Sequence, residues 1–202
     1  MKLYYSPGAC SLSPHIALIE AGLAHDLVKV NTKTKHFDGG GDFLAVNAKG
    51  YVPVLELDDG TRLTEGPAIV QYLADQKPGA ALAPAAGTRD RYRLQEMLGY
   101  INSELHKSYS PLFKADVTPA VREERTAYLH KRYAFLDKRL AKHDWLVGDR
   151  FSVADAYLFA VTRWAEPLKV DLSAFPHVLS FQKRVAARPA VRAALDAEGL
   201  AH

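Results

Sequence analysis

The stretch that decides the fold is Ser6-Pro-Gly-Ala-Cys10-Ser-Leu-Ser13-Pro14-His15, which joins a predicted strand to a predicted helix. The run before it, residues 2–5, is short and apolar, and residues 16–21 are typical of a helix. Ser13 is placed to cap this helix, and Pro14 suits its first position. The one cysteine of the chain, Cys10, therefore lies in a strand-to-helix turn, three residues before the predicted cap.

This turn has an electrostatic consequence for Cys10. Free amide N–H groups and the helix dipole create positive potential at a helix start. We expect the potential to stabilise a thiolate there and to lower the pKa of Cys10. From the turn alone, Cys10 fits a small buried hydrophobe equally well. The spacing Cys10-Ser-Leu-Ser13 also imitates the redox motif Cys-x-x-Cys, with Ser in the second place.

Composition limits the classes of protein that fit. The 202 residues allow one large domain or two small ones, and a single cysteine excludes an intrachain disulfide. That cysteine usage suits a reducing compartment, so we expect a cytoplasmic protein without a secretory leader. We expect no membrane span, because no apolar run approaches roughly 20 residues. The 26 basic and 23 acidic residues are interspersed, so nucleic-acid binding is not indicated.

The first part of the chain alternates strands and helices. Strands are predicted near residues 2–5, 27–31, 51–57 and 61–64, and helices near 16–21, 43–47 and 68–74. Residues 32–42 are polar and Gly-rich and predict a surface loop. This order predicts a small mixed four-stranded sheet with helices on its faces. Pro53 inside the third strand requires an edge, a bulge or a cis bond, and is interpreted as structural.

The rest of the chain is predicted to be helical. An Ala/Pro/Gly-rich linker, residues 79–87, separates an α/β domain, 1–78, from an all-α domain, 88–202. One predicted helix, 88–110, carries the polar stripe Ser103, His106 and Lys107. Ser152 and Asp155 form a capping-box pattern at the start of an apolar, central helix and are interpreted as structural.

Four motifs in this order resemble the cytosolic glutathione transferases over the whole chain, and the bacterial beta class most. They are the Cys10 stretch, Leu63-Thr-Glu-Gly-Pro-Ala-Ile-Val-Gln-Tyr-Leu-Ala-Asp75, Glu104-Leu-His-Lys-Ser-Tyr-Ser-Pro-Leu-Phe113 and Phe151-Ser-Val-Ala-Asp-Ala-Tyr-Leu-Phe159. The resemblance implies a thioredoxin-like N-terminal domain, a helical C-terminal domain and a homodimer. It also implies glutathione as co-substrate, a small electrophilic second substrate and no metal.

The resemblance assigns glutathione contacts that the chemistry of the tripeptide supports. The main chain of Val52 would pair with the tripeptide as a strand does. Glu65 would take its α-ammonium group, the Gly66 amide its α-carboxylate, and Lys35 its Gly carboxylate.

The remaining contacts involve the thiol and the helical domain. Cys10 and His106 are the expected catalytic residues, and Ser103 and Lys107 complete the expected glutathione site. Class members often carry Asn where this chain has Gly99, which puts a contact to the γ-glutamyl end across the dimer in doubt.

Three functions fit these residues. The first is a transferase that conjugates the glutathione thiolate to small, hydrophobic electrophiles in detoxification. The second is a glutathione-dependent thiol–disulfide oxidoreductase or peroxidase in which Cys10 is the nucleophile. The third is a non-catalytic ligand-binding or regulatory protein of the same fold, which would have no need of Cys10, Lys35, Glu65 and His106 together. The second substrate is not specified, although Tyr109, Phe113 and Trp164 are candidate linings of its pocket.

Overall fold

The computed structural model describes residues 1–200 and separates the chain into two compact units. The first unit contains Met1–Ala83 together with the chain from Arg188 onward, and the second contains Pro84–Ala187. The division after Ala83 falls inside the predicted linker, residues 79–87. The predicted helical domain, 88–202, differs from the second unit at its end, because helix α9 (Pro189–Glu198) packs against α1 (Leu12–Glu20) in the first unit.

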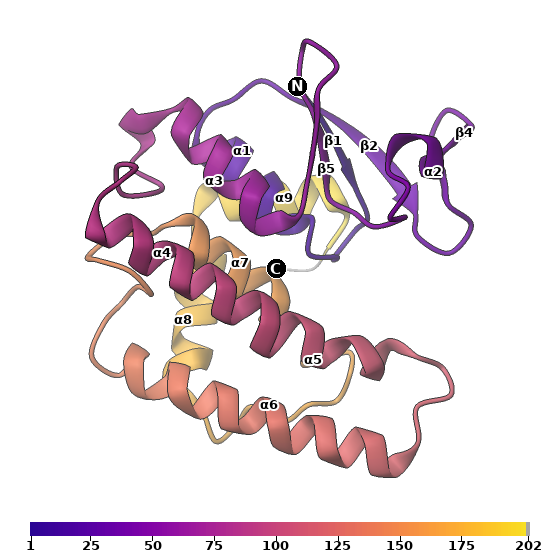
Figure 1. Ribbon diagram of the computed structural model, residues 1–202. Coiled ribbons are helices and arrows are strands. Elements are labelled where there is room, and N and C mark those ends of the chain that lie inside the picture. Colours follow the sequence, from indigo (N-terminus) through magenta and orange to yellow (C-terminus); the bar gives the residue numbers. More distant parts are fainter. Residues whose placement is uncertain (201–202) are drawn as a thin grey trace. The chain divides into compact units, whose positions relative to one another are not determined.

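The first unit is built on a mixed sheet. Its strands are β1 (Lys2–Tyr5), β2 (Asp26–Asn31), β3 (His36–Phe37), β4 (Gly41–Asp42), β5 (Val54–Glu56) and β6 (Arg62–Thr64), in the order β4-β3-β2-β1-β5-β6. β1 pairs with β2 in parallel and with β5 in antiparallel fashion. β1, β2, β5 and β6 are the predicted strands, and they form the thioredoxin-like arrangement with the helices around them (Figure 1).

Alternation along β1 gives the sheet two buried faces. Leu3 lies opposite Leu55, and Tyr4 lies opposite Val54. On the Tyr4 side, Phe43 of the short helix α2 (Phe43–Val46) joins Tyr4, Val30 and Val54 in one buried cluster. Successive side chains of a strand point to opposite faces, so Leu3 and Leu55 face the other side of the sheet.

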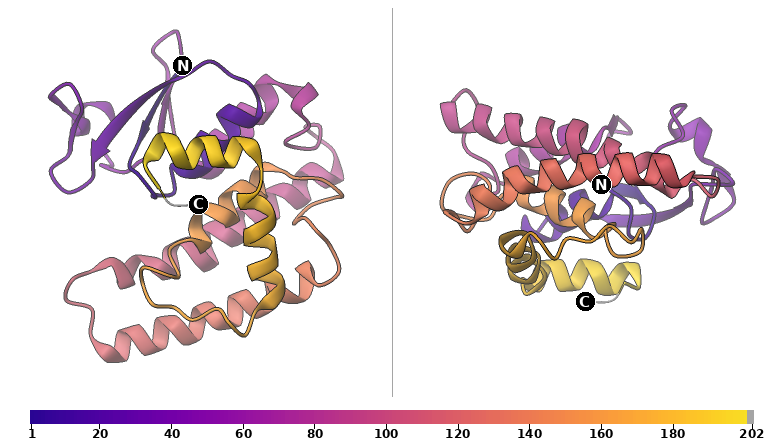
Figure 2. Two further views of the ribbon diagram at one scale, coloured as in Figure 1. Left: turned by 180° about the vertical axis from the view of Figure 1, so that it is seen from behind. Right: turned by 90° about the horizontal axis from the view of Figure 1, so that it is seen from below.

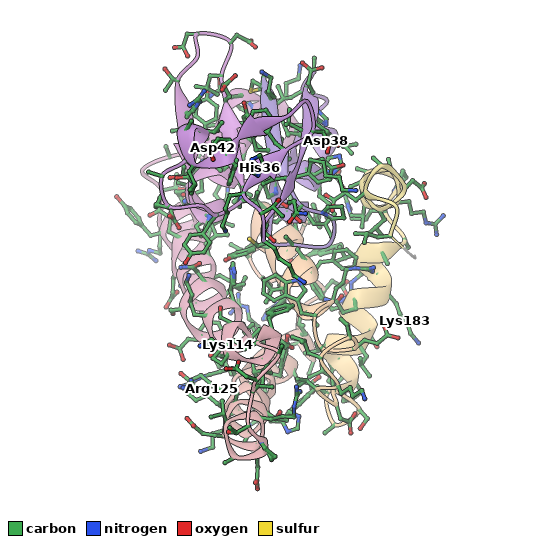
Figure 3. The ribbon with its side chains drawn as sticks, turned by 90° about the vertical axis from the view of Figure 1, so that its right-hand side faces the viewer. His36, Asp38, Asp42, Lys114, Arg125 and Lys183 are labelled. Atoms are coloured by element: carbon green, nitrogen blue, oxygen red, sulfur yellow. The ribbon has the colours of Figure 1, made fainter. Side chains whose placement is uncertain are left out.

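The segment predicted as a surface loop, residues 32–42, contains the two short strands β3 and β4. Phe37 causes the difference, because its ring packs edge-on against Tyr4 at 5.6 Å and holds the segment to β2. Only Gly fits at position 41, since a Cβ there would lie 2.0 Å from the Phe37 ring. Figure 3 labels three polar side chains of this segment, His36, Asp38 and Asp42, all of them exposed.

The predicted starts of helices α1 and α3 have different outcomes in the structure. α1 begins at Leu12 after the N-cap Ser11, so the prediction of Ser13 as the cap is wrong. The Ser13 hydroxyl instead donates to the carbonyl oxygen of Cys10 at 3.0 Å. Helix α3 (Gly66–Gln76), predicted near 68–74, begins after Glu65 with a proline in its first turn and is followed by the 3-10 turn η1 (Pro78–Ala80).

Within the first unit, charged groups join helix α9 and the residue before it to α1 and to the turn that precedes α1. Glu198 contacts His15 Nδ1 at 2.9 Å, and both side chains are buried. Its second carboxylate oxygen accepts the Gly8 N–H at 2.9 Å, directly before the Cys10 turn. Arg188 binds Glu20 of α1 through two hydrogen bonds of 2.6 and 3.0 Å. Figure 2 shows α9, in yellow, beside α1.

The second unit is helical throughout. Its elements are α4 (Arg89–Tyr100), the π-helical turn η2 (Ile101–His106), α5 (Lys107–Tyr109), the 3-10 turn η3 (Ser110–Phe113), α6 (Pro119–Leu140), α7 (Val153–Thr162) and α8 (Pro176–Ala186). Every residue of α7 is buried, so α7 is the central helix of this unit. Within residues 1–200, no helix combines the length and the apolar character needed to cross a membrane.

The start of α7 carries the predicted capping box. Asp155 Oδ2 accepts hydrogen bonds from the backbone N–H and the hydroxyl of Ser152, each at 2.8 Å. Asp155 Oδ1 accepts the Leu146 N–H at 2.9 Å. These bonds lower the pKa of Asp155, but complete burial outweighs them and raises it to about 6.

We predict that Asp155→Asn lowers stability by an amount that depends on pH. The Asn amide has only one oxygen, so its N–H group would face one or two of the three donors that Asp155 accepts. Folding raises the pKa of Asp155, so the parent loses stability as the pH rises from about 4 to above 6 and the buried carboxyl ionises. The loss is up to about 3 kcal/mol. The Asn variant has no group that ionises at this position and therefore lacks the loss. The difference in free energy of unfolding between parent and variant, measured in urea, should therefore be larger at pH 4.5 than at pH 7.5. A difference that stays constant over this range would contradict the account.

Candidate functional site

The turn that carries Cys10 is held by short hydrogen bonds. The Ser11 hydroxyl accepts the Ser6 N–H at 3.1 Å and donates to the Ser6 carbonyl at 3.2 Å. Gly8 has φ of +70°, in the left-handed region that favours glycine. Cys10, which is partly buried, directly precedes the N-cap of α1 and is closer to the helix start than the sequence predicted.

Val52 is brought directly to Cys10. The Cys10 thiol donates to the Val52 carbonyl oxygen, with Sγ and O 3.4 Å apart. The Val52–Pro53 peptide bond is cis, one of the three possibilities that the sequence left open. Val52 is itself buried just before β5, so its main chain lies at the end of the sheet next to the thiol.

Glu65 and Gly66 stand at the start of α3. Glu65 has φ of +69°, a conformation that costs a residue with a Cβ free energy and is found most often at functional positions. Its Oε1 accepts a hydrogen bond from Lys49 Nζ at 2.6 Å, and Lys49 also donates to the Thr64 hydroxyl at 2.7 Å. The Glu65 and Lys49 side chains are 65% and 48% exposed, so the ion pair is solvated and weak.

Lys35 lies in the segment between β2 and β3. It too has a positive φ, of 59°. Its Nζ donates to the Gly50 carbonyl at 2.8 Å and lies 5.8 Å from the centre of the Tyr51 ring. The Lys35 ammonium group is thus anchored next to an exposed aromatic ring.

Residues 47–53 connect these groups to one another. Within this segment Lys49 contacts Glu65, Gly50 contacts Lys35, and Val52 contacts Cys10. Asn47 fixes its course by donating from Nδ2 to the Tyr51 carbonyl at 2.8 Å. Lys49 and Asn47 were missed in the sequence, where the polar turn Asn47-Ala-Lys-Gly50 ahead of Val-Pro was the available signal.

In the second unit, η2 carries Ser103 and His106, and Lys107 follows it. His106 Nδ1 lies 2.6 Å from the Tyr157 hydroxyl, and its ring packs edge-on against Trp164 at 4.9 Å. Ser103 is exposed and donates from Oγ to the Gly99 carbonyl at 3.0 Å. Lys107 is exposed. Tyr157 lies on α7 and contacts His106, and it was not among the site residues predicted from the sequence.

The three candidate pocket residues have different surroundings. Tyr109 is fully buried and its hydroxyl lies 2.9 Å from that of Tyr133, so it belongs to the core. Burial raises the pKa of Tyr109 far above its ordinary value. Trp164 is 8% exposed, and Phe113 packs edge-on against it at 5.3 Å while remaining 55% exposed. Phe113 and Trp164 can therefore present an aromatic surface near His106.

Comparison with known proteins shows the family of the chain. Residues 8–76 match the glutathione S-transferase N-terminal domain, and residues 100–189 match the C-terminal domain of the same family. The glutathione S-transferase GstA of Escherichia coli O157:H7 is 47% identical over 99% of this chain and 100% of its own. The chain belongs to the glutathione S-transferase family.

Solved structures of this family superpose closely on the protein. The ternary complex of BphK, a bacterial glutathione S-transferase, has a TM-score of 0.97 and 54% identity, and covers 99% of this chain and 100% of its own. A sphingomonad glutathione S-transferase complexed with glutathione has a TM-score of 0.96 and 47% identity, with both chains fully covered. The bacterial beta-class enzyme of Sphingomonas chungbukensis gives 0.96 and 48%, again with both chains fully covered. The fold and the resemblance to the beta class are confirmed.

Proposed function

We propose that the protein conjugates the thiolate of glutathione to small, hydrophobic electrophiles. The observation that carries this proposal is the course of residues 47–53, which contact Glu65, Lys35 and Cys10. Residues 47–53 thus contact an anion, a cation and a thiol. Glutathione carries groups that can pair with the two charges and lie beside the thiol: an amino-carboxylate at one end, a carboxylate at the other and a thiol in its middle.

Each end of the tripeptide has a proposed partner. Glu65 takes the α-ammonium group, and the Gly66 amide at the first position of α3 holds the α-carboxylate. Lys35 binds the Gly carboxylate, and the main chain of Val52 pairs with the middle of the tripeptide. Lys49 on Glu65 is an exposed partner and is readily displaced or shared, because such ion pairs contribute at most about 1 kcal/mol.

The chemical step uses the positive potential before α1. Amide N–H groups at the helix start stabilise a sulfur anion placed beside Cys10. The glutathione thiolate attacks an electrophilic carbon, a C–S bond forms, and the leaving group departs with its electron pair. An aryl halide would release halide, and an epoxide would open to an alkoxide that takes a proton. Ser103, His106 and Lys107 remain proposed glutathione-binding residues, and Phe113 and Trp164 are the proposed surface for the electrophile.

The placement of Cys10 also supports a second candidate function, thiol–disulfide exchange. Cys10 is partly accessible and directly precedes the N-cap of α1, where thiolates are favoured. The Cys10 thiolate would attack a glutathione disulfide, form a mixed disulfide with one half and release the other as thiolate. A second glutathione would then resolve the mixed disulfide and regenerate Cys10.

The setting of this activity is also part of the proposal. We infer a homodimer, which the exposed aromatic side chains Tyr51, Tyr92 and Phe135 support as sites for burial between copies. The single cysteine suits a reducing cytoplasm, and conjugation of foreign electrophiles there would be a detoxification reaction.

We predict that Glu65→Ala weakens glutathione binding more than Lys35→Ala does. A charged hydrogen bond from Glu65, whose backbone is fixed just before α3, to the ammonium group is worth about tenfold or more in the dissociation constant. Lys35 is half-buried, but its ammonium group already donates to the Gly50 carbonyl, so we expect it to contribute about fivefold at most. Calorimetric titration measures both. Glu65→Gln should behave like Glu65→Ala, and Lys33→Ala, in the same segment as Lys35, should bind like the parent. The reverse order would refute the proposed orientation of glutathione.

We predict that Cys10→Ala separates the two candidate activities. Conjugation of an aryl halide should largely persist, because helix amides and other hydrogen-bond donors can still stabilise the glutathione thiolate. Reduction of hydroxyethyl disulfide should be lost almost entirely, because the nucleophile is gone. Assays of parent and variant with both substrates test this, and equal loss of the two activities would show that Cys10 is required for both.

A further inference from the structure

Lys49 and Glu65 form an ion pair just before α3. Lys49 Nζ donates to Glu65 Oε1 at 2.6 Å and to the Thr64 hydroxyl at 2.7 Å. Thr64 ends β6 and Glu65 precedes the first residue of α3, so the ammonium group is held at the junction of strand and helix. All three residues belong to the first unit. Lys49 is not among the residues predicted from the sequence to bind glutathione.

The hydrogen bonds of this ion pair leave two of its groups available. A lysine ammonium group has three hydrogens, and an ionised carboxylate has two accepting oxygens. Within residues 1–200, Lys49 Nζ donates to Glu65 and Thr64 only, and the Glu65 carboxylate accepts through Oε1 only. The third N–H of Lys49 and the Oε2 atom of Glu65 therefore have no protein partner in this part of the chain. Both side chains are exposed, so a ligand from solvent can reach them.

The first amide of α3 adds a second donor beside the pair. Pro67 has no N–H, and the N–H groups of Ala68 and Ile69 bond to the Glu65 carbonyl. The Gly66 N–H makes no hydrogen bond to any residue between 1 and 200. A Cβ added at Gly66 would meet no atom within 4 Å, apart from its chain neighbours and the backbone of its own helix. There is thus open space beside this amide.

An α-amino-α-carboxylate group supplies what these atoms need. Its ammonium group can donate to Glu65 Oε2, and its carboxylate can accept from the Gly66 N–H and from Lys49 Nζ. We propose that Lys49 is a specificity-determining residue that binds the α-carboxylate of the γ-glutamyl end of glutathione while it remains paired with Glu65. In this arrangement each of the four charges has opposite charges as its neighbours. The inference rests on the proposed function and adds a binding residue to it.

The ion pair selects ligands that carry both charges on one carbon. A ligand with only an ammonium group would compete with Lys49 for the Glu65 carboxylate, and a ligand with only a carboxylate would be repelled by Glu65. A zwitterion satisfies both side chains and displaces neither. This end of the site therefore takes a free amino acid head group, as in γ-glutamyl thiols. Thiol peptides that are linked through their α-carboxylate are disfavoured, because the linkage removes the negative charge.

Calorimetric titration of the full-length protein with two ligands tests this role. The ligands are glutathione and its α-carboxamide, in which an uncharged amide replaces the carboxylate of the γ-glutamyl end. Lys49→Met removes the charge of an exposed side chain and should weaken glutathione binding about fivefold, the upper range for an exposed ion pair. The dissociation constant of the α-carboxamide should change less than twofold. Lys33→Met, at another exposed lysine of the first unit, should bind both ligands like the parent.

Salt provides a second measurement that separates charge from shape. The ratio of the glutathione dissociation constants of Lys49→Met and the parent should fall towards one in about 1 M NaCl, where the Debye length is about 3 Å. A ratio that stays the same in high salt would overturn the proposal, because the lysine would then act through packing.

The two ligands also separate this proposal from the function on which it rests. Equal weakening of glutathione and the α-carboxamide in Lys49→Met would overturn the contact to the α-carboxylate. Unchanged or tighter binding of glutathione in this variant would also overturn it, since Lys49 would then be a plain surface charge or a competitor for Glu65. Each of these outcomes retains glutathione binding by the parent. A parent that does not bind glutathione would instead refute the proposed function, and the role of Lys49 with it.

Discussion

The hydrogen bond from the Cys10 thiol to the Val52 carbonyl joins the two pieces of chain on which the candidate site depends. One piece is the turn before α1, which supplies positive potential. The other is the segment before β5, which reaches Lys35 through Gly50 and Glu65 through Lys49. A displacement of either piece would separate the Cys10 sulfur from the groups proposed to bind the two ends of glutathione. Glu198 supports the same turn from α9, through the Gly8 N–H.

Backbone conformation adds to this constraint at two positions. Lys35 and Glu65 both occupy the left-handed region, which disfavours side chains with a Cβ. Both are positions where a charge is proposed to bind glutathione, and both side chains have a partner in the structure. The strain is maintained because neighbouring elements fix the chain on either side, β6 and α3 in the case of Glu65. We infer that this backbone conformation sets the direction of the Lys35 and Glu65 side chains.

The fold was predictable from local patterns, whereas several contacts were not. The order of strands and helices in residues 1–78 and the capping box at Ser152 each depend on residues close in sequence, and the structure has them. The predicted cap at Ser13 is wrong because the helix begins two residues earlier: the Ser11 carbonyl already accepts the His15 N–H, and a proline is tolerated in the first turn of a helix. Helix α9 was expected, but its place beside α1 depends on the His15–Glu198 contact across the whole chain. Lys49 and Tyr157 were missed for the same reason, and Tyr157 was also hidden in a helix that is apolar nearly all round.

The ionisation state of bound glutathione tests the account most directly. In the Cys10→Ala variant the chain has no cysteine of its own, so the ultraviolet thiolate absorbance on binding belongs to glutathione alone. The account predicts that the bound thiol is largely ionised at pH 7. Its pKa would then lie well below the pKa of about 8.5 of a free cysteine thiol. A bound thiol whose pKa equals that of free glutathione would contradict the account, because the α1 start would then not be acting on the sulfur.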